Sequence, residues 1–107
     1  MATITDKKVD VWLKKFKRKL MLRYNPEKII LFGSRAKKDH LVESDIDLVI
    51  VSEKFENIKW PRRLSEVAEL WEGLITIEPL CYTPKEFKEK QKQIGILQQA
   101  LKEGVEL

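Results

Sequence analysis

The sequence predicts a small α/β domain in which helices cover a mixed β-sheet. Short apolar runs rich in β-branched and aromatic residues recur at 28–32, 45–52 and 74–82. Segments with helical spacing of apolar residues precede, separate and follow these runs. This alternation is typical of one sheet with packed helices, and 107 residues suffice for one such unit. We therefore expect a single domain spanning residues 1–107.

The helices are expected from apolar spacing and from the residues that end them. In the first, Val9, Leu13, Phe16 and Leu20 recur at helical spacing, and Asn25-Pro26 ends the helix. Proline begins two later helices, at Trp60-Pro61 and Thr83-Pro84. The expected helices cover 6–24, 34–38, 60 to a stop at Gly73, 83–93, and 94–102 before Gly104, with a loop at 40–44.

Each expected strand has a distinguishing feature. Residues 28–32, KIILF, are apolar enough to be buried on both sides, and Gly33 closes this strand. Residues 45–52, DIDLVIVS, form a strand that begins with acidic residues. Residues 74–82 contain Pro79, which cannot donate a ladder hydrogen bond, so this strand lies at a sheet edge or carries a bulge.

Net charge, cysteine and histidine counts, and the length of apolar runs limit which ligands the protein can bind and where it is located. The net charge of +4 favours polyanionic partners, which leaves nucleotide, nucleic acid and anionic membrane open. The single cysteine, Cys81, excludes an internal disulfide, and the single histidine, His40, excludes a Cys/His zinc cluster. No apolar run approaches the roughly 20 residues of a membrane span, and the first ten residues do not resemble a signal peptide. We expect a soluble, cytoplasmic protein.

Asp45 and Asp47 are the first candidates for chemistry. They lie two residues apart on a predicted strand, so their carboxylates leave the same face of the sheet. Two anions held together repel each other, and a divalent cation such as Mg²⁺ would relieve that repulsion. Acidic residues are also ordinary at a solvated strand start, so this pair alone leaves both interpretations open.

Gly33-Ser34 and Glu78 extend the candidate site. Gly33-Ser34 follows a strand and precedes a helix, where backbone N–H groups, the Ser34 hydroxyl and the Arg35 guanidinium could hold a phosphate. An ordinary strand-to-helix turn has the same pattern. Glu78 is an acid within LITIEPL, either a third metal ligand or general base, or an edge-strand side chain in solvent.

In combination these motifs resemble the polymerase-β-like nucleotidyltransferase superfamily, and in particular its minimal nucleotidyltransferases. The resemblance is centred on LFGSRAKKDHLVESDIDLVIVS, residues 31–52: Gly-Ser, a gap, Asp-x-Asp on a strand, then one acid on a later strand. It implies that Gly33, Ser34 and Arg35 contact a triphosphate. It also implies that Asp45, Asp47 and Glu78 are catalytic residues that bind two Mg²⁺ ions.

The resemblance implies transfer of a nucleoside monophosphate, most often AMP from ATP, to a hydroxyl of a protein or other acceptor. Minimal nucleotidyltransferases often act as antitoxins beside a helical HEPN-type toxin, which would supply such an acceptor. The alternatives are a binding module that neutralises a partner by contact without transfer, and a nucleic-acid-binding protein that uses its basic first helix. Lys38 and Glu78, which differ from the residues common in the family, keep the binding module open.

Other residues have less specific interpretations. His40 is expected in solvent, Cys81 as a small buried hydrophobic residue, and Trp12 and Trp71 in a core or interface. The apolar residues of 94–105 fit either packing on this domain or the surface of a homodimer. Positive charge is concentrated in the first quarter of the chain, where a solvated helix face and a phosphate-binding face are both consistent with the sequence.

Overall fold

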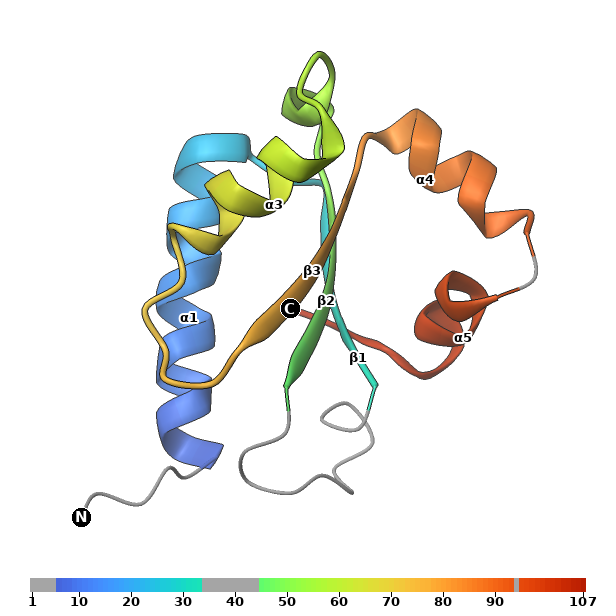
Figure 1. Ribbon diagram of the computed structural model, residues 1–107. Helices are drawn as coiled ribbons and strands as arrows, with labels where there is room; N and C mark the ends of the chain where they lie inside the picture. The colour runs from blue at the N-terminus through green and yellow to red at the C-terminus, as the bar shows by residue number, and fades with distance from the viewer. Residues whose placement is uncertain (1–5, 34–44, 94) are drawn as a thin grey trace.

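The computed structural model describes residues 6–33, 45–93 and 95–107. Four strands form one sheet in the order β3-β2-β1-β4 (Figure 1). The central β2 is antiparallel to β1 and parallel to β3, and the short β4 pairs antiparallel with β1. The strands are β1 (Lys28–Phe32), β2 (Ile46–Val51), β3 (Ile77–Tyr82) and β4 (Val105–Glu106).

Helices cover both faces of this sheet (Figure 1). On one face lie α1 (Asp6–Tyr24) and α3 (Trp60–Ala68), and on the other lie α4 (Pro84–Gln91) and α5 (Ile96–Glu103). A short 3-10 helix, η1 (Glu53–Phe55), follows β2. The predicted α/β class is therefore confirmed. The loop expected at 40–44 and the helix expected at 34–38 lie outside the described residues.

Each face of the sheet has its own core because side chains alternate along the strands. Leu48 and Ile50 of β2 are buried with Phe16 and Leu20 of α1. Val49 and Val51 face the other way and are buried with aromatic and apolar side chains beneath α4 and α5. Because both faces of β2 are covered, its residues after Asp47 are apolar on both sides of the strand and do not alternate with polar residues.

The connection between α3 and β3 differs from the prediction. The helix ends at Ala68 rather than continuing to Gly73, and the strand begins at Ile77 rather than at residue 74. Trp71 accounts for both differences. Its indole Nε1 donates to the Ile75 carbonyl at 2.7 Å, and its ring packs edge-on against Phe16 at 5.3 Å. This anchoring holds the chain in an irregular path between the two elements.

The predicted edge position of the Pro79 strand is confirmed. β3 is the outermost strand beside β2, so Pro79 removes no hydrogen bond from the sheet. The carbonyl of Cys81 on the same strand accepts a hydrogen bond from Arg63 Nη1 at 3.1 Å. Both features disfavour pairing with a further strand on this edge.

The C-terminal segment packs partly on its own domain. Leu97 of α5 is buried and Leu101 is half-buried in the core beneath this helix. β4 was not predicted from the sequence, and it pairs with β1 through Ile30 and Leu31. Trp12 and Trp71 are half-buried in contact with each other, and Cys81 is buried, as expected. Among the described residues no helix is long and apolar enough to cross a membrane.

Candidate functional site

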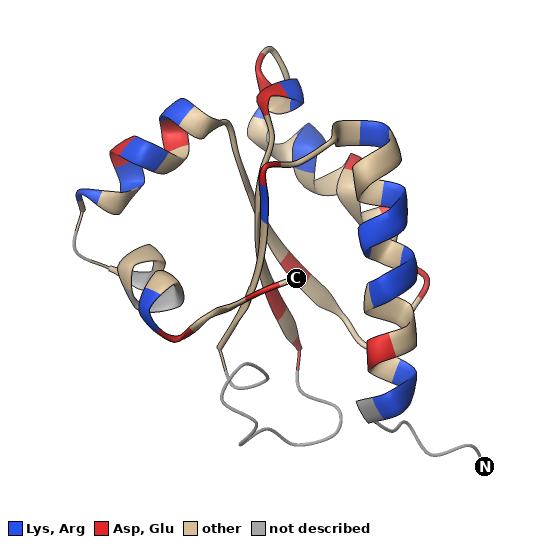
Figure 2. Cartoon of the chain, turned by 180° about the vertical axis from the view of Figure 1, so that it is seen from behind, with Lys and Arg blue, Asp and Glu red and all other residues tan. Residues whose placement is uncertain are grey.

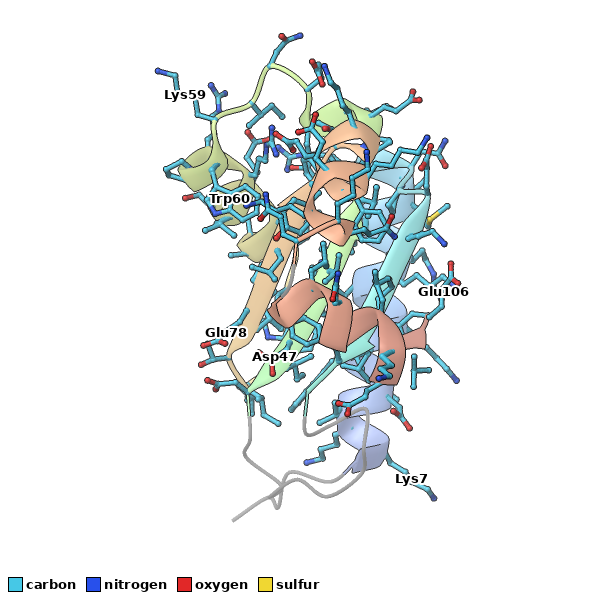
Figure 3. The ribbon with its side chains drawn as sticks, turned by 90° about the vertical axis from the view of Figure 1, so that its right-hand side faces the viewer. Lys7, Asp47, Lys59, Trp60, Glu78 and Glu106 are labelled. Atoms are coloured by element: carbon cyan, nitrogen blue, oxygen red, sulfur yellow. The ribbon has the colours of Figure 1, made fainter. Side chains whose placement is uncertain are left out.

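Asp47 and Glu78 lie side by side at one end of the sheet. Asp47 of β2 is in register with Glu78 of β3, and these strands are parallel, so both side chains leave the same face. This is the face of the sheet that α5 covers. Figure 3 shows the Asp47 and Glu78 carboxylates close together at the end of the sheet where β2 begins. The neighbours in sequence, Ile46 and Ile77, face the opposite core.

The environment of Asp47 favours its protonated form. The pKa of Asp47 is raised from 3.8 to about 6, and partial burial is the main cause. A hydrogen bond between the protonated Asp47 and Glu78, and the negative charges of Glu78 and Asp45, contribute the rest of this rise. Asp47 therefore holds its proton more strongly than a solvent-exposed aspartate does. Structural ion pairs ordinarily show the opposite shift.

Gly33 directly follows β1 and lies beside Asp47 at the same end of the sheet. Its φ of +76° lies in the left-handed region that favours glycine. A Cβ at this position would lie 2.5 Å from Oδ2 of Asp47, which is too close for any side chain. The lack of a side chain at Gly33 therefore lets its backbone lie directly beside the Asp47 carboxylate.

The donor set fits a hard divalent cation. Asp47 and Glu78 offer carboxylate oxygens, and within the described residues neither is paired with a basic side chain. Mg²⁺ is commonly held by one or two carboxylates, with water and substrate phosphates completing the shell. In the part of the chain that the structure describes, no three Asp, Glu, His or Cys side chains converge closely enough to hold a metal ion. The described residues thus provide two adjacent carboxylates as candidate metal ligands, those of Asp47 and Glu78, with Asp45 nearby.

The structure describes four of the six predicted site residues and brings three of them together. Asp45 lies just before β2, exposed to solvent, and its charge acts on Asp47. Gly33, Asp47 and Glu78 form the group described above. The other two predicted residues, Ser34 and Arg35, lie outside the described residues, as do Lys37, Lys38 and His40.

Sequence reasoning missed Arg63, which fixes the strand that carries Glu78. Its guanidinium is buried and donates to the carbonyls of Ile58 and Cys81 and to the carboxylate of Glu86, at 2.7, 3.1 and 2.6 Å. It thereby joins α3, β3 and α4. Its position four residues before buried Val67 could have indicated an inward-facing arginine.

Comparisons with known proteins agree with this geometry. The sequence model of the nucleotidyltransferase domain matches residues 6–105. A crystal structure from Sulfolobus solfataricus, of a protein assigned as a nucleotidyltransferase, is similar in fold with a TM-score of 0.58. It is 20% identical over 92% of this chain and 83% of that one. BolA1 from Arabidopsis thaliana has a TM-score of 0.56 and 22% identity over 68% of this chain and 92% of that one.

At these identities the two structures show a shared fold only. No protein with a curated description is detectably similar in sequence. The match to the domain model, by contrast, covers nearly the whole chain, including both strands that carry the carboxylates. The chain belongs to the nucleotidyltransferase domain family.

Proposed function

We propose that this protein transfers a nucleoside monophosphate from a nucleoside triphosphate, with ATP as the favoured donor, to a hydroxyl group of a macromolecular acceptor. The observation that carries the proposal is the Asp47–Glu78 pair, held together on neighbouring parallel strands with the Gly33 backbone beside Asp47. A carboxylate pair without a basic partner is suited to binding a metal–triphosphate complex.

In this proposal the acceptor oxygen attacks the α-phosphorus and pyrophosphate leaves, so the protein supplies positioning and charge rather than a covalent intermediate. Asp47 and Glu78, with Asp45 nearby, would hold two Mg²⁺ ions, which would neutralise triphosphate charge and favour the ionised acceptor hydroxyl. Gly33, Ser34 and Arg35 orient the phosphates. Glu78 also accepts the proton of the acceptor hydroxyl.

The acceptor is proposed to be a hydroxyl of a partner protein. A helical HEPN-type toxin, with this chain as its antitoxin, is the partner that the family resemblance suggests. The described residues form one sheet with helices on both faces, and among them there is no second domain that could hold a large acceptor. A separate partner would supply that part of the substrate.

The direct test is transfer of label from α-labelled ATP to proteins that co-purify with the chain, in Mg²⁺ and in chelator. Label on a partner with wild type, and none with Asp47→Asn, supports the proposal. Asp10→Asn is the matched control, since it removes the same group from the exposed surface of α1. A stable complex without transfer favours the binding module instead.

A further inference from the structure

The outward face of α1 is strongly basic and takes no part in the proposed nucleotide site. α1 contains eight Lys or Arg residues and two Asp residues. Its core-facing side chains, Val9, Leu13, Phe16 and Leu20, are buried. At 100° per residue, the opposite face contains no acidic residue. This outward face consists of Lys7, Val11, Lys14, Lys15, Arg18 and Leu22, all exposed.

Ion pairing separates this face from the flanks of the same helix. On the flanks, Lys19 pairs with Glu72 and Arg23 pairs with Glu66, each at 3.0 Å. On the outward face, Lys7, Lys14 and Arg18 form no ion pair with any described residue. Figure 2 shows the basic residues spaced along the length of the helix. The positive charge is thus available to an external anion.

Three kinds of partner could accept such a face, and the residues favour one. A membrane-surface helix inserts its apolar side, but here that side is buried against the sheet. The centre of a protein interface is typically more apolar than its rim and depleted of lysine. Here the exposed Val11 and Leu22 are roughly 16 Å apart along the axis, with cations between them. Nucleic-acid interfaces are polar and much more positively charged.

A hollow adjoins the N-terminal end of this face. It has a volume of about 370 Å³ and is lined by Lys7, Lys8, Val11 and Trp12. Its surface is mainly apolar, and two of the four residues that line it are lysines. This combination is suited to a sugar or a base whose neighbouring phosphates contact lysine.

We propose that the outward face of α1 binds a nucleic-acid backbone through its phosphates, without reading sequence. Its phosphate contacts come from Lys7, Lys14, Lys15 and Arg18. About four contacts predict that log K falls with log salt at a slope of about −3 to −4. Between roughly 50 and 200 mM salt, this slope weakens binding about a hundredfold.

The test is fluorescence anisotropy of labelled duplexes of about 20 base pairs, one of RNA and one of DNA, across that range of salt. The triple variant Lys14→Gln, Lys15→Gln, Arg18→Gln should bind at least about tenfold more weakly, with a slope closer to zero by about 3. The matched control changes Lys85, Lys88 and Lys92 of the α4 region to Gln, which removes equal charge from another exposed surface. This control variant should retain both the wild-type affinity and the wild-type slope of log K against log salt.

Equal affinity for both duplexes supports recognition of the shared phosphodiester backbone, and preference for one identifies which nucleic acid is bound. Circular dichroism checks that each variant folds. Asp47→Asn should bind as the wild type does, so the result is independent of the proposed nucleotide transfer. The proposal is overturned if the α4 control loses as much affinity as the α1 variant. It is equally overturned if wild type at about 50 mM salt binds neither duplex, including the case where it binds only anionic vesicles.

Discussion

Asp47→Asn should stabilise the protein in the absence of metal and nucleotide, because the native carboxylate is held against Glu78. Burial and this neighbour raise the pKa of Asp47 from 3.8 to about 6. One pKa unit corresponds to about 1.4 kcal/mol, which gives an upper limit of about 3 kcal/mol. Because Asp47 is partly exposed, solvent screening lowers the expected gain to about 1–2 kcal/mol at pH 7.5.

The stability gain of Asp47→Asn should depend on pH. Between pH 4 and 6 the folded protein retains a proton on Asp47 that the unfolded chain releases, so the wild type loses stability as pH rises through this window. Asparagine does not titrate. The advantage of the variant should therefore be small at pH 4, grow to pH 6, and level off above pH 7.

The assay is urea unfolding of wild type, Asp47→Asn and the control Asp10→Asn at several pH values, in chelator. The difference at pH 7.5 corresponds to a rise in melting temperature of about 5 °C or more. Asp10 is exposed on α1, so its variant should show no comparable gain. A destabilised Asp47→Asn, or a gain that does not change with pH, would refute the reasoning about carboxylate repulsion.

Three further predictions concern the residues around the site. Gly33→Ala should cost about 1–3 kcal/mol because of positive φ and the clash with Asp47 Oδ2, and adding Asp47→Ala should recover part of the loss in urea unfolding. Arg63→Met should cost about 3 kcal/mol in the same assay, since it removes the ion-pair partner of Glu86 and the donor to the buried Cys81 carbonyl. Burial raises the pKa of the Cys81 thiol to about 12, so a thiol reagent at pH 8 should modify it only after unfolding, and fast native labelling would contradict this.

Much of the fold could be predicted from local pattern. The bounds of α1 follow from apolar spacing that Asn25-Pro26 ends, and Pro79 indicated the edge position of β3. The features that were predicted wrongly or missed depend on contacts between residues far apart in the sequence or on very short elements. The irregular connection before β3 is fixed by Trp71 packing on a helix more than fifty residues earlier, which no local pattern contains. β4 is two residues long, too short for any periodicity.

Only part of the candidate site could be predicted, because the rest also depends on contacts between residues that are distant in the sequence. Alternation placed Asp45 and Asp47 on one face, but the pairing of Asp47 with Glu78 depends on strand register, which one strand cannot specify. The family resemblance supplied that link. The contact between Gly33 and Asp47 likewise follows from the antiparallel pairing of β1 with β2, in which Phe32 lies opposite Asp47.

The most direct test of the central claim is thermal unfolding of wild type and Asp47→Asn with ATP, in Mg²⁺ and in chelator. Ligand at about 100 times its dissociation constant should stabilise the wild type by about 2.7 kcal/mol, equivalent to roughly 10 °C or more. We predict a rise in wild type that requires Mg²⁺ and is absent in the variant. If no nucleoside triphosphate shifts the wild type, or if the variant responds equally, Asp47 and Glu78 do not form a metal–nucleotide site.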